Sequence, residues 1–131
     1  MAVRAVRGAT QVEVDDREQV LAASRELVTL VMQRNGLAAE DVISIMFTAT
    51  KDLASVAPAL AARQLGLHDV ALICAQEMGV EGSMPRVVRL LAHVETELPR
   101  ADITNVYLNG TEVLRRDVPA VPDQGPSGEP S

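Results

Sequence analysis

The chain has 131 residues and a formal net charge of −6 at pH 7, a length that suits one domain with a modest core. The negative field repels nucleic acid and anionic membranes, and no basic run or aromatic ladder opposes it. Both are therefore excluded as partners.

Cysteine usage and the first residues predict a cytoplasmic protein. Cys74 is the single cysteine, so an internal disulfide is ruled out, and residues 1–4 do not resemble the apolar core of a signal peptide. No apolar run approaches the roughly 20 residues needed to span a bilayer.

The first part of the chain predicts a strand and then a long amphipathic helix. Residues 2–7 fit a short strand that Gly8 ends, because a bulge or sharp bend is cheap at glycine. The helix is expected over 17–35, with Asp15 or Asp16 as its cap. Its apolar stripe consists of Val20, Leu21, Ser24, Leu27, Val28, Val31 and Met32.

A buried strand and a short helix follow. Residues 42–49 are rich in β-branched side chains and almost continuously apolar, which predicts a central strand covered on both faces. The next helix is alanine-rich, has Pro58 in its first turn and stops at Gly66. Its inner side is expected to carry Ala59, Ala62 and Leu65.

The following segments predict a strand over 70–75, a loop over 76–86 and a strand over 87–96. In the last strand, period-two alternation separates the side chains onto two faces. One face holds Arg89, Leu91, His93 and Glu95, and the other holds Val88, Leu90, Ala92 and Val94.

A β-hairpin is predicted near the C-terminus. Asn109 and Gly110 separate residues 106–108 from residues 111–114, and both central residues tolerate positive φ. This is the strongest short-range hairpin signal in the chain.

The order of elements is β-α-β-α-β-β-β, which predicts an α+β fold: a mixed five-stranded sheet with two main helices on one face. This domain is expected over 1–116. A disordered or flexible tail should follow over 117–131, which is rich in Pro, Gly and Ser. The second face of the sheet still has to be buried. Ferredoxin-like domains and small trimeric sheet proteins share this pattern.

Two arginines at strand-like positions, Arg7 and Arg89, indicate an anion site, because a guanidinium among apolar residues needs a negative partner. The alternative is an ion pair within the chain, with Glu95, Glu97 or Glu13. The sequence has no phosphate-binding glycine motif, no zinc-ligand spacing and no serine-centred triad, so no metal site is expected.

Four other candidates have plain structural alternatives. Cys74 suits a small apolar residue better than a nucleophile, and Glu77, where a strand enters a loop, suits a solvated position better than a site. Tyr107 can bind a carboxylate through its hydroxyl or pack in a core. Arg63 fits a surface salt bridge. These residues alone predict only a domain with a candidate arginine-lined pocket.

A set of segments carries a resemblance to a known family. The segments are Val3–Thr10, Thr48–Leu53, Cys74–Met78, Pro85–Arg89 and Val106–Leu108, closing with Leu114-Arg115. In order and spacing they resemble the monofunctional chorismate mutases of the homotrimeric, mixed-sheet type typified by the bacillus enzyme. The match runs from about Val3 to Asp117.

The resemblance implies an isomerase that converts chorismate to prephenate in aromatic amino acid biosynthesis (the shikimate pathway), with no cofactor. As the ether C–O bond breaks, negative charge gathers on its oxygen, so fixed cations and a reactive conformer are needed. By the resemblance Arg89 bridges a substrate carboxylate and the ether oxygen, while Arg7 and Tyr107 hold a carboxylate. Glu77 and the backbone at Cys74 take the ring hydroxyl.

The resemblance also implies a trimeric pseudo-barrel with its sites at subunit interfaces. Leu72 and Ile73 would line the substrate ring, and Leu114 and Arg115 would close the pocket. The neighbouring subunit would supply Ala57, Ala59, Leu60 and Arg63. Ala57 stands where a phenylalanine is expected and Leu60 where the bacillus enzyme has lysine, so we expect weaker substrate binding.

Two other functions stay open. A catalytically weak relative would bind an aromatic-pathway dicarboxylate for regulation, which Ala57 and Leu60 favour. A trimeric enamine/imine deaminase has a comparable architecture, although its motifs are absent here. In addition, a strict two-residue turn would place Tyr107 and Arg115 on opposite faces, so that Arg115 needs a bulge or acts from a strand end.

Overall fold

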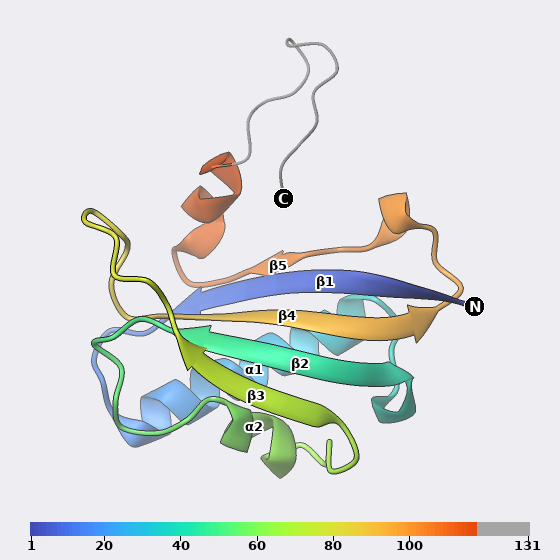
Figure 1. The fold of residues 1–131 in the computed structure, drawn as a ribbon, viewed down its shortest axis with the longest axis horizontal. Coiled ribbons are helices and arrows are strands. Elements are labelled where there is room, and N and C mark those ends of the chain that lie inside the picture. Colours follow the sequence, from blue (N-terminus) through green and yellow to red (C-terminus); the bar gives the residue numbers. More distant parts are fainter. Residues whose placement is uncertain (118–131) are drawn as a thin grey trace, which may run out of the picture.

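The computed structural model describes the backbone of residues 1–117 and the side chains of residues 1–114. Its centre is a five-stranded sheet in the order β3-β2-β4-β1-β5 (Figure 1). The strands are β1 (Ala2–Gln11), β2 (Val42–Ala49), β3 (Ala71–Gln76), β4 (Val87–Thr96) and β5 (Val106–Tyr107). β4 runs antiparallel to β1 and β2, whereas the outer pairs β2–β3 and β1–β5 are parallel. The predicted mixed α+β fold is confirmed.

Both α-helices lie against one face of the sheet (Figure 1). The helical elements are α1 (Arg17–Arg34), α2 (Ala59–Gln64) and the 3₁₀ turns η1 (Ala39–Asp41), η2 (Arg100–Asp102) and η3 (Thr111–Asp117). α1 begins after Asp16, whose carboxylate accepts a 3.0 Å hydrogen bond from the Gln19 backbone N–H. Its predicted stripe is buried except for Met32, which is partly buried. None of the described helices is long and apolar enough to cross a membrane.

β1 is longer than predicted, because it continues through Gly8 to Gln11. The expected end at Gly8 is therefore wrong. A Cβ added at Gly8 would lie 3.0 Å from Leu27 Cδ1 and 3.2 Å from the Val106 carbonyl oxygen. Gly8 is thus a point of close approach between β1, α1 and β5, where a side chain has no room.

We expect Gly8→Ala to lower the free energy of unfolding by about 1–3 kcal/mol, because the added methyl group must displace packed neighbours. Urea or thermal denaturation measures this change. Gly79→Ala is the matched control, since a Cβ there would be no closer than 3.6 Å to another atom. If both variants have the same free energy of unfolding as the unmodified protein, the close approach at Gly8 does not limit the size of the side chain there.

The second face of the sheet is uncovered in the described chain. Met46 on β2 is 45% exposed, Ile73 on β3 is 59% exposed and Val3 on β1 is 56% exposed. The prediction that residues 42–49 are covered on both faces is therefore wrong for one chain. We call this surface the open face; pairing across the strands places on it Val3, Ala5, Arg7, Ser44, Met46, Thr48, Ile73, Arg89, Leu91, His93 and Glu95.

The alternation predicted for β4 is confirmed. Val88, Leu90, Ala92 and Val94 are buried against the helices, and the four intervening side chains belong to the open face. The arginine of this strand therefore points away from the helical layer.

α2 is short, as predicted, and buries Ala59 and Ala62 together with Ala61. Leu65 was expected on the inner side, and that expectation is wrong, because Leu65 is 39% exposed. The residue is the C-cap, followed by Gly66 at a φ of 94°, so helical periodicity no longer sets its direction.

The predicted β-hairpin is wrong, although Asn109 and Gly110 do have positive φ values of 54° and 94°. The chain that follows forms η3 instead of a returning strand. The buried Thr111 hydroxyl lies 3.0 Å from the Ala9 carbonyl oxygen and 2.8 Å from that of Leu108. These contacts hold the start of η3 against β1. A hairpin arm would instead have turned away from β1 and run back along β5.

Because residues 111–114 are not a strand, the conflict of phase between Tyr107 and Arg115 disappears. The side chain of Arg115 lies outside the described residues. Apart from Asp117, so does the tail predicted over 117–131, and the domain boundary at 116 stays a prediction.

Candidate active site

One row of paired residues crosses the open face. Tyr107 on β5 pairs with Ala9 on β1, Ala9 pairs with Arg89 on β4, and Arg89 pairs with Thr48 on β2. Neighbouring strands lie about 4.8 Å apart, so the backbones of Tyr107 and Arg89 are roughly 10 Å apart, with small Ala9 between them. Arg7 is two residues from Ala9 on β1 and therefore projects from the same face.

Arg89 is held by a carboxylate at the exit of β3. Its Nε lies 3.0 Å from Glu77 Oε2, and the two side chains are 44% and 17% exposed. The Thr48 hydroxyl donates a 2.7 Å hydrogen bond to the same oxygen. Charge-assisted contacts of this length are strong, so the guanidinium is fixed before any ligand arrives.

None of the carboxylates that were considered from the sequence as partners of Arg89 forms its salt bridge in the structure. Those candidates were Glu95, Glu97 and Glu13. Glu95 shares the open face but lies six residues along β4 from Arg89, roughly 20 Å away in a strand. Glu77 is near because β3 runs parallel to β2, and its backbone N–H donates a 2.9 Å hydrogen bond to the Ala49 carbonyl. Strand order, which the sequence did not show, creates this neighbour.

Arg7 presents a second cation on the open face. Its backbone N–H donates a 2.8 Å hydrogen bond to Asn105 Oδ1, which ties β1 to the segment before β5. Arg7 is partly buried as a residue, and its guanidinium makes no hydrogen bond or salt bridge with the residues that the structure describes. Within that part of the chain, Arg7 has no counter-charge of its own.

A second group of predicted residues lies around α2 and β3. Ala57 and Cys74 both line a cavity of about 320 Å³, which we call the edge cavity. Asp15 fixes the loop that carries Ala57, since its carboxylate accepts hydrogen bonds from the backbone N–H groups of Ala54 at 3.0 Å and Ser55 at 3.2 Å. The edge cavity is thus bounded by one sheet edge and one anchored loop.

The other predicted residues differ in exposure. Arg63 is exposed and Leu60 is partly buried. Ile73 projects from the open face, whereas Leu72 packs against the core. Ala59 is 5% exposed, so its methyl group belongs to the core of the chain.

Leu114 is partly buried on η3, and it is the last residue whose side chain is described. Four of the predicted site residues, Arg7, Glu77, Arg89 and Tyr107, therefore lie in one group on the sheet, and two, Ala57 and Cys74, lie at the edge cavity.

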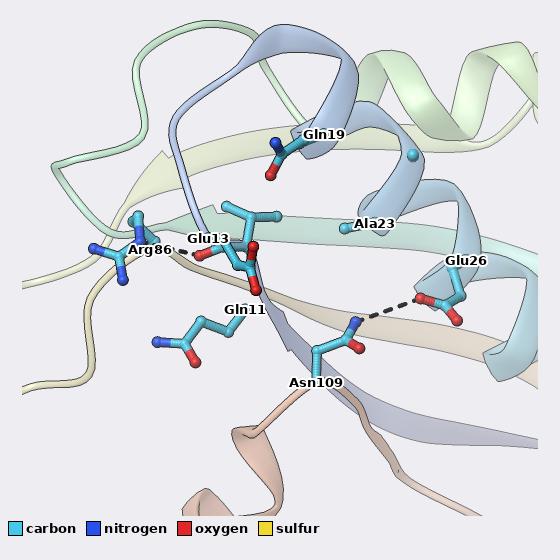
Figure 2. A pocket seen from close by; sticks show the side chains of 9 residues that line it. Gln11, Glu13, Gln19, Ala23, Glu26, Arg86 and Asn109 are labelled. Carbon is cyan, nitrogen blue, oxygen red and sulfur yellow. Dashed lines mark hydrogen bonds between the residues drawn. The ribbon is translucent and has the colours of Figure 1, made fainter.

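A larger cavity, of about 840 Å³, lies between the end of β1 and the start of α1 (Figure 2). Its wall carries Glu13, Glu26, Arg86 and Asn109. Arg86 Nε donates a 3.0 Å hydrogen bond to the Val12 carbonyl, and the Asn109 amide donates one of 3.4 Å to Glu26. Two carboxylates beside an engaged guanidinium disfavour an anionic ligand. No motif in the sequence had pointed to this cavity.

The sheet, its two helices and the two arginines on its open face define a small α+β protein with a candidate anion site. The family described as chorismate mutase type I matches residues 3–118. The chain is 44% identical to chorismate mutase AroH of Thermus thermophilus over 117 residues, which are 88% of this chain and 96% of that protein. It is 39% identical to chorismate mutase AroH of Bacillus subtilis strain 168 over 119 residues, which are 90% and 94% of the two chains.

A solved structure, chorismate mutase from Clostridium thermocellum, shares the fold with a TM-score of 0.82 and 42% sequence identity. The similarity covers 83% of this chain and 97% of that one. The chain therefore belongs to the type I chorismate mutase family, which makes it an isomerase.

Proposed function

We propose that the chain converts chorismate to prephenate by an intramolecular Claisen rearrangement. The observation that carries this proposal is the contact of Arg89 with Glu77, which fixes a guanidinium on the open face. Arg7 lies on the adjacent strand of the same face. Two cations on neighbouring strands of one face suit a substrate with two carboxylates. Family membership supplies the reaction.

The residues act by position and charge. The rearrangement breaks one C–O bond and forms one C–C bond within a single molecule, so it requires no proton transfer. Arg89 is oriented through Nε, and its terminal amino groups reach a substrate carboxylate and the ether oxygen, where negative charge develops. Arg7 and Tyr107 hold a carboxylate. Glu77 and the backbone at Cys74 take the ring hydroxyl.

We infer that three subunits complete the sites. Met46, Ile73 and Leu91 form an apolar centre on the open face, and β3 is an edge strand with an unpaired side. Association buries both features. It also brings the edge cavity and α2 of one subunit, with Ala57, Leu60 and Arg63, to the Arg89 cluster of the next.

The remaining roles follow the same arrangement. Ile73 lines the substrate ring with its side chain, and Leu72, whose side chain packs against the core, contributes backbone alone, while Leu114 and Arg115 close the pocket. Ala59 contributes backbone alone, because its methyl group is in the core. A cytoplasmic location stays a prediction.

Adding chorismate to the purified protein, and following its loss together with prephenate formation, tests the proposal. Turnover supports the mutase. Binding without turnover would instead support a regulatory protein that binds an aromatic-pathway dicarboxylate. Ala57 and Leu60 favour this alternative, because position 57 has no aromatic ring and position 60 has no cation. The match to the chorismate mutase type I family over residues 3–118 supports the mutase over the enamine/imine deaminase alternative.

We expect the double substitution Ala57→Phe and Leu60→Lys to lower KM by about tenfold, because it adds an aromatic surface and a cation to the wall. Steady-state kinetics on chorismate gives this value. Leu65→Lys is the matched control, since it adds the same charge at an exposed position beyond the end of α2. A KM that stays unchanged in the double variant would show that this wall does not face the substrate.

A further inference from the structure

Thr48 lies next to both members of the Arg89–Glu77 pair. It is partly buried on β2, and it pairs directly with Arg89 across the β2–β4 ladder. Its hydroxyl donates to Glu77 Oε2 at 2.7 Å, and Arg89 Nε lies 3.0 Å from that same oxygen. Two donors from two strands therefore meet at one carboxylate oxygen.

The Thr48 hydrogen bond acts on the side chain of Glu77. The Glu77 backbone is already held, because its N–H donates to the Ala49 carbonyl at 2.9 Å and the preceding Gln76 pairs with Ala49. The Thr48 hydroxyl therefore sets the direction in which the Glu77 carboxylate points. A carboxylate has about four acceptor positions, so Glu77 can still accept a hydrogen bond from the hydroxyl group of a substrate.

We propose that Thr48 is a positioning residue that orients Glu77 and, through Glu77, Arg89. The inference rests on the proposed mutase activity. With Oε2 fixed by Thr48, the Arg89 guanidinium docks at one point through Nε and directs its terminal amino groups along the open face. Without the Thr48 hydroxyl, the side chains of Glu77 and Arg89 each populate several rotamers, and preorganisation of the site is lost.

Thr48→Val tests the hydroxyl alone, because valine keeps the β-branched shape that suits a strand. We expect kcat to fall about tenfold while KM changes less than about threefold, since the loss concerns the transition state. Thr48→Ser restores a hydroxyl and should keep kcat within about twofold. Thr96→Val, the same exchange at the far end of β4, should leave both constants unchanged.

A double substitution separates positioning from general support. In a Glu77→Ala background the hydroxyl has no carboxylate to orient, so Thr48→Val should lower kcat by less than about twofold. A full tenfold loss in that background would overturn the inference, because Thr48 would then act by another route. A normal kcat in Thr48→Val alone would overturn it as well.

Crystal structures provide a readout that does not depend on turnover. Thr48→Val should show the Glu77 carboxylate and the Arg89 guanidinium in altered rotamers. An unchanged 3.0 Å contact between them would overturn the role of Thr48 even in an active enzyme. If the unmodified protein shows no turnover, the proposed function fails, and the crystal comparison still decides whether Thr48 positions the pair.

Discussion

Arg89→Lys is expected to lower kcat for chorismate by about 10²–10³-fold, the scale of losing one preorganised donor to a developing oxyanion. Arginine offers five N–H donors in a planar fork, so it can bind Glu77 through Nε and still reach two substrate oxygens. An ammonium group is compact and sits at one point. It would satisfy Glu77 or the substrate, but it cannot reproduce the span between them.

Steady-state kinetics and a denaturation curve should be recorded on the same preparation, because the loss must occur without a matching loss of stability. Arg34→Lys at the exposed end of α1 is the matched control and should change neither. If Arg89→Lys keeps a near-normal kcat, Arg89 has a structural role and the assignment of the ether oxygen contact is wrong.

Met46→Glu is expected to separate the subunits and lower activity by about 100-fold or more. Met46 is 45% exposed in one chain and pairs with Leu91 and Ile73 at the apolar centre of the open face. Burying an unpaired carboxylate there costs several kcal/mol, and each 1.4 kcal/mol is about a tenfold change in association.

Sedimentation velocity measures the mass, with about 14.0 kDa expected for the separated variant. Turnover is measured at the same protein concentration. Val14→Glu is the control, because Val14 is 49% exposed in the loop before α1 and not on the open face. A Met46→Glu variant that keeps the mass of the unmodified protein would show that the open face is not the contact between subunits.

Strong periodicity in the sequence predicted most of the elements. The alternation in residues 87–96 and the stripe of α1 each rest on many side chains, so the strand and the helix were recognised with correct bounds or within one residue. The errors fall where one tertiary contact outweighs a local preference. Gly8 looked like a break, but it is a close approach to Leu27 and Val106.

The hairpin was the largest error, and its cause is also tertiary. The positive φ values at Asn109 and Gly110 were correct, yet positive φ fixes a turn and not the path after it. The contacts of Thr111 with Ala9 and Leu108 decide that path, and they join residues that only the fold brings together. A local pattern therefore had no means of excluding the hairpin.

An anion site at Arg7 and Arg89 was predicted from charges in apolar strands, but the contacts between its residues were not. The site itself stays a proposal, and so do the roles of the individual residues, which came with the family resemblance. The partner of Arg89 was missed, because Glu77 is close only when β3 lies beside β2. Thr48 was missed for the same reason, since one hydroxyl in an apolar strand carries no signal of its own.

The place of β1 in the sheet affects how the chain is made. β1 is the first strand to be synthesised, yet its partners come late: Ala2 pairs with Thr96, and Ala9 pairs with Tyr107. Pairing over such long separations in sequence requires costly loop closure and slows folding. During translation β1 must wait until β4 and β5 have left the ribosome. Arg7 and Arg89 therefore become neighbours only after β4 has been made, so a chain that stalls before β4 cannot bring the two guanidinium groups together.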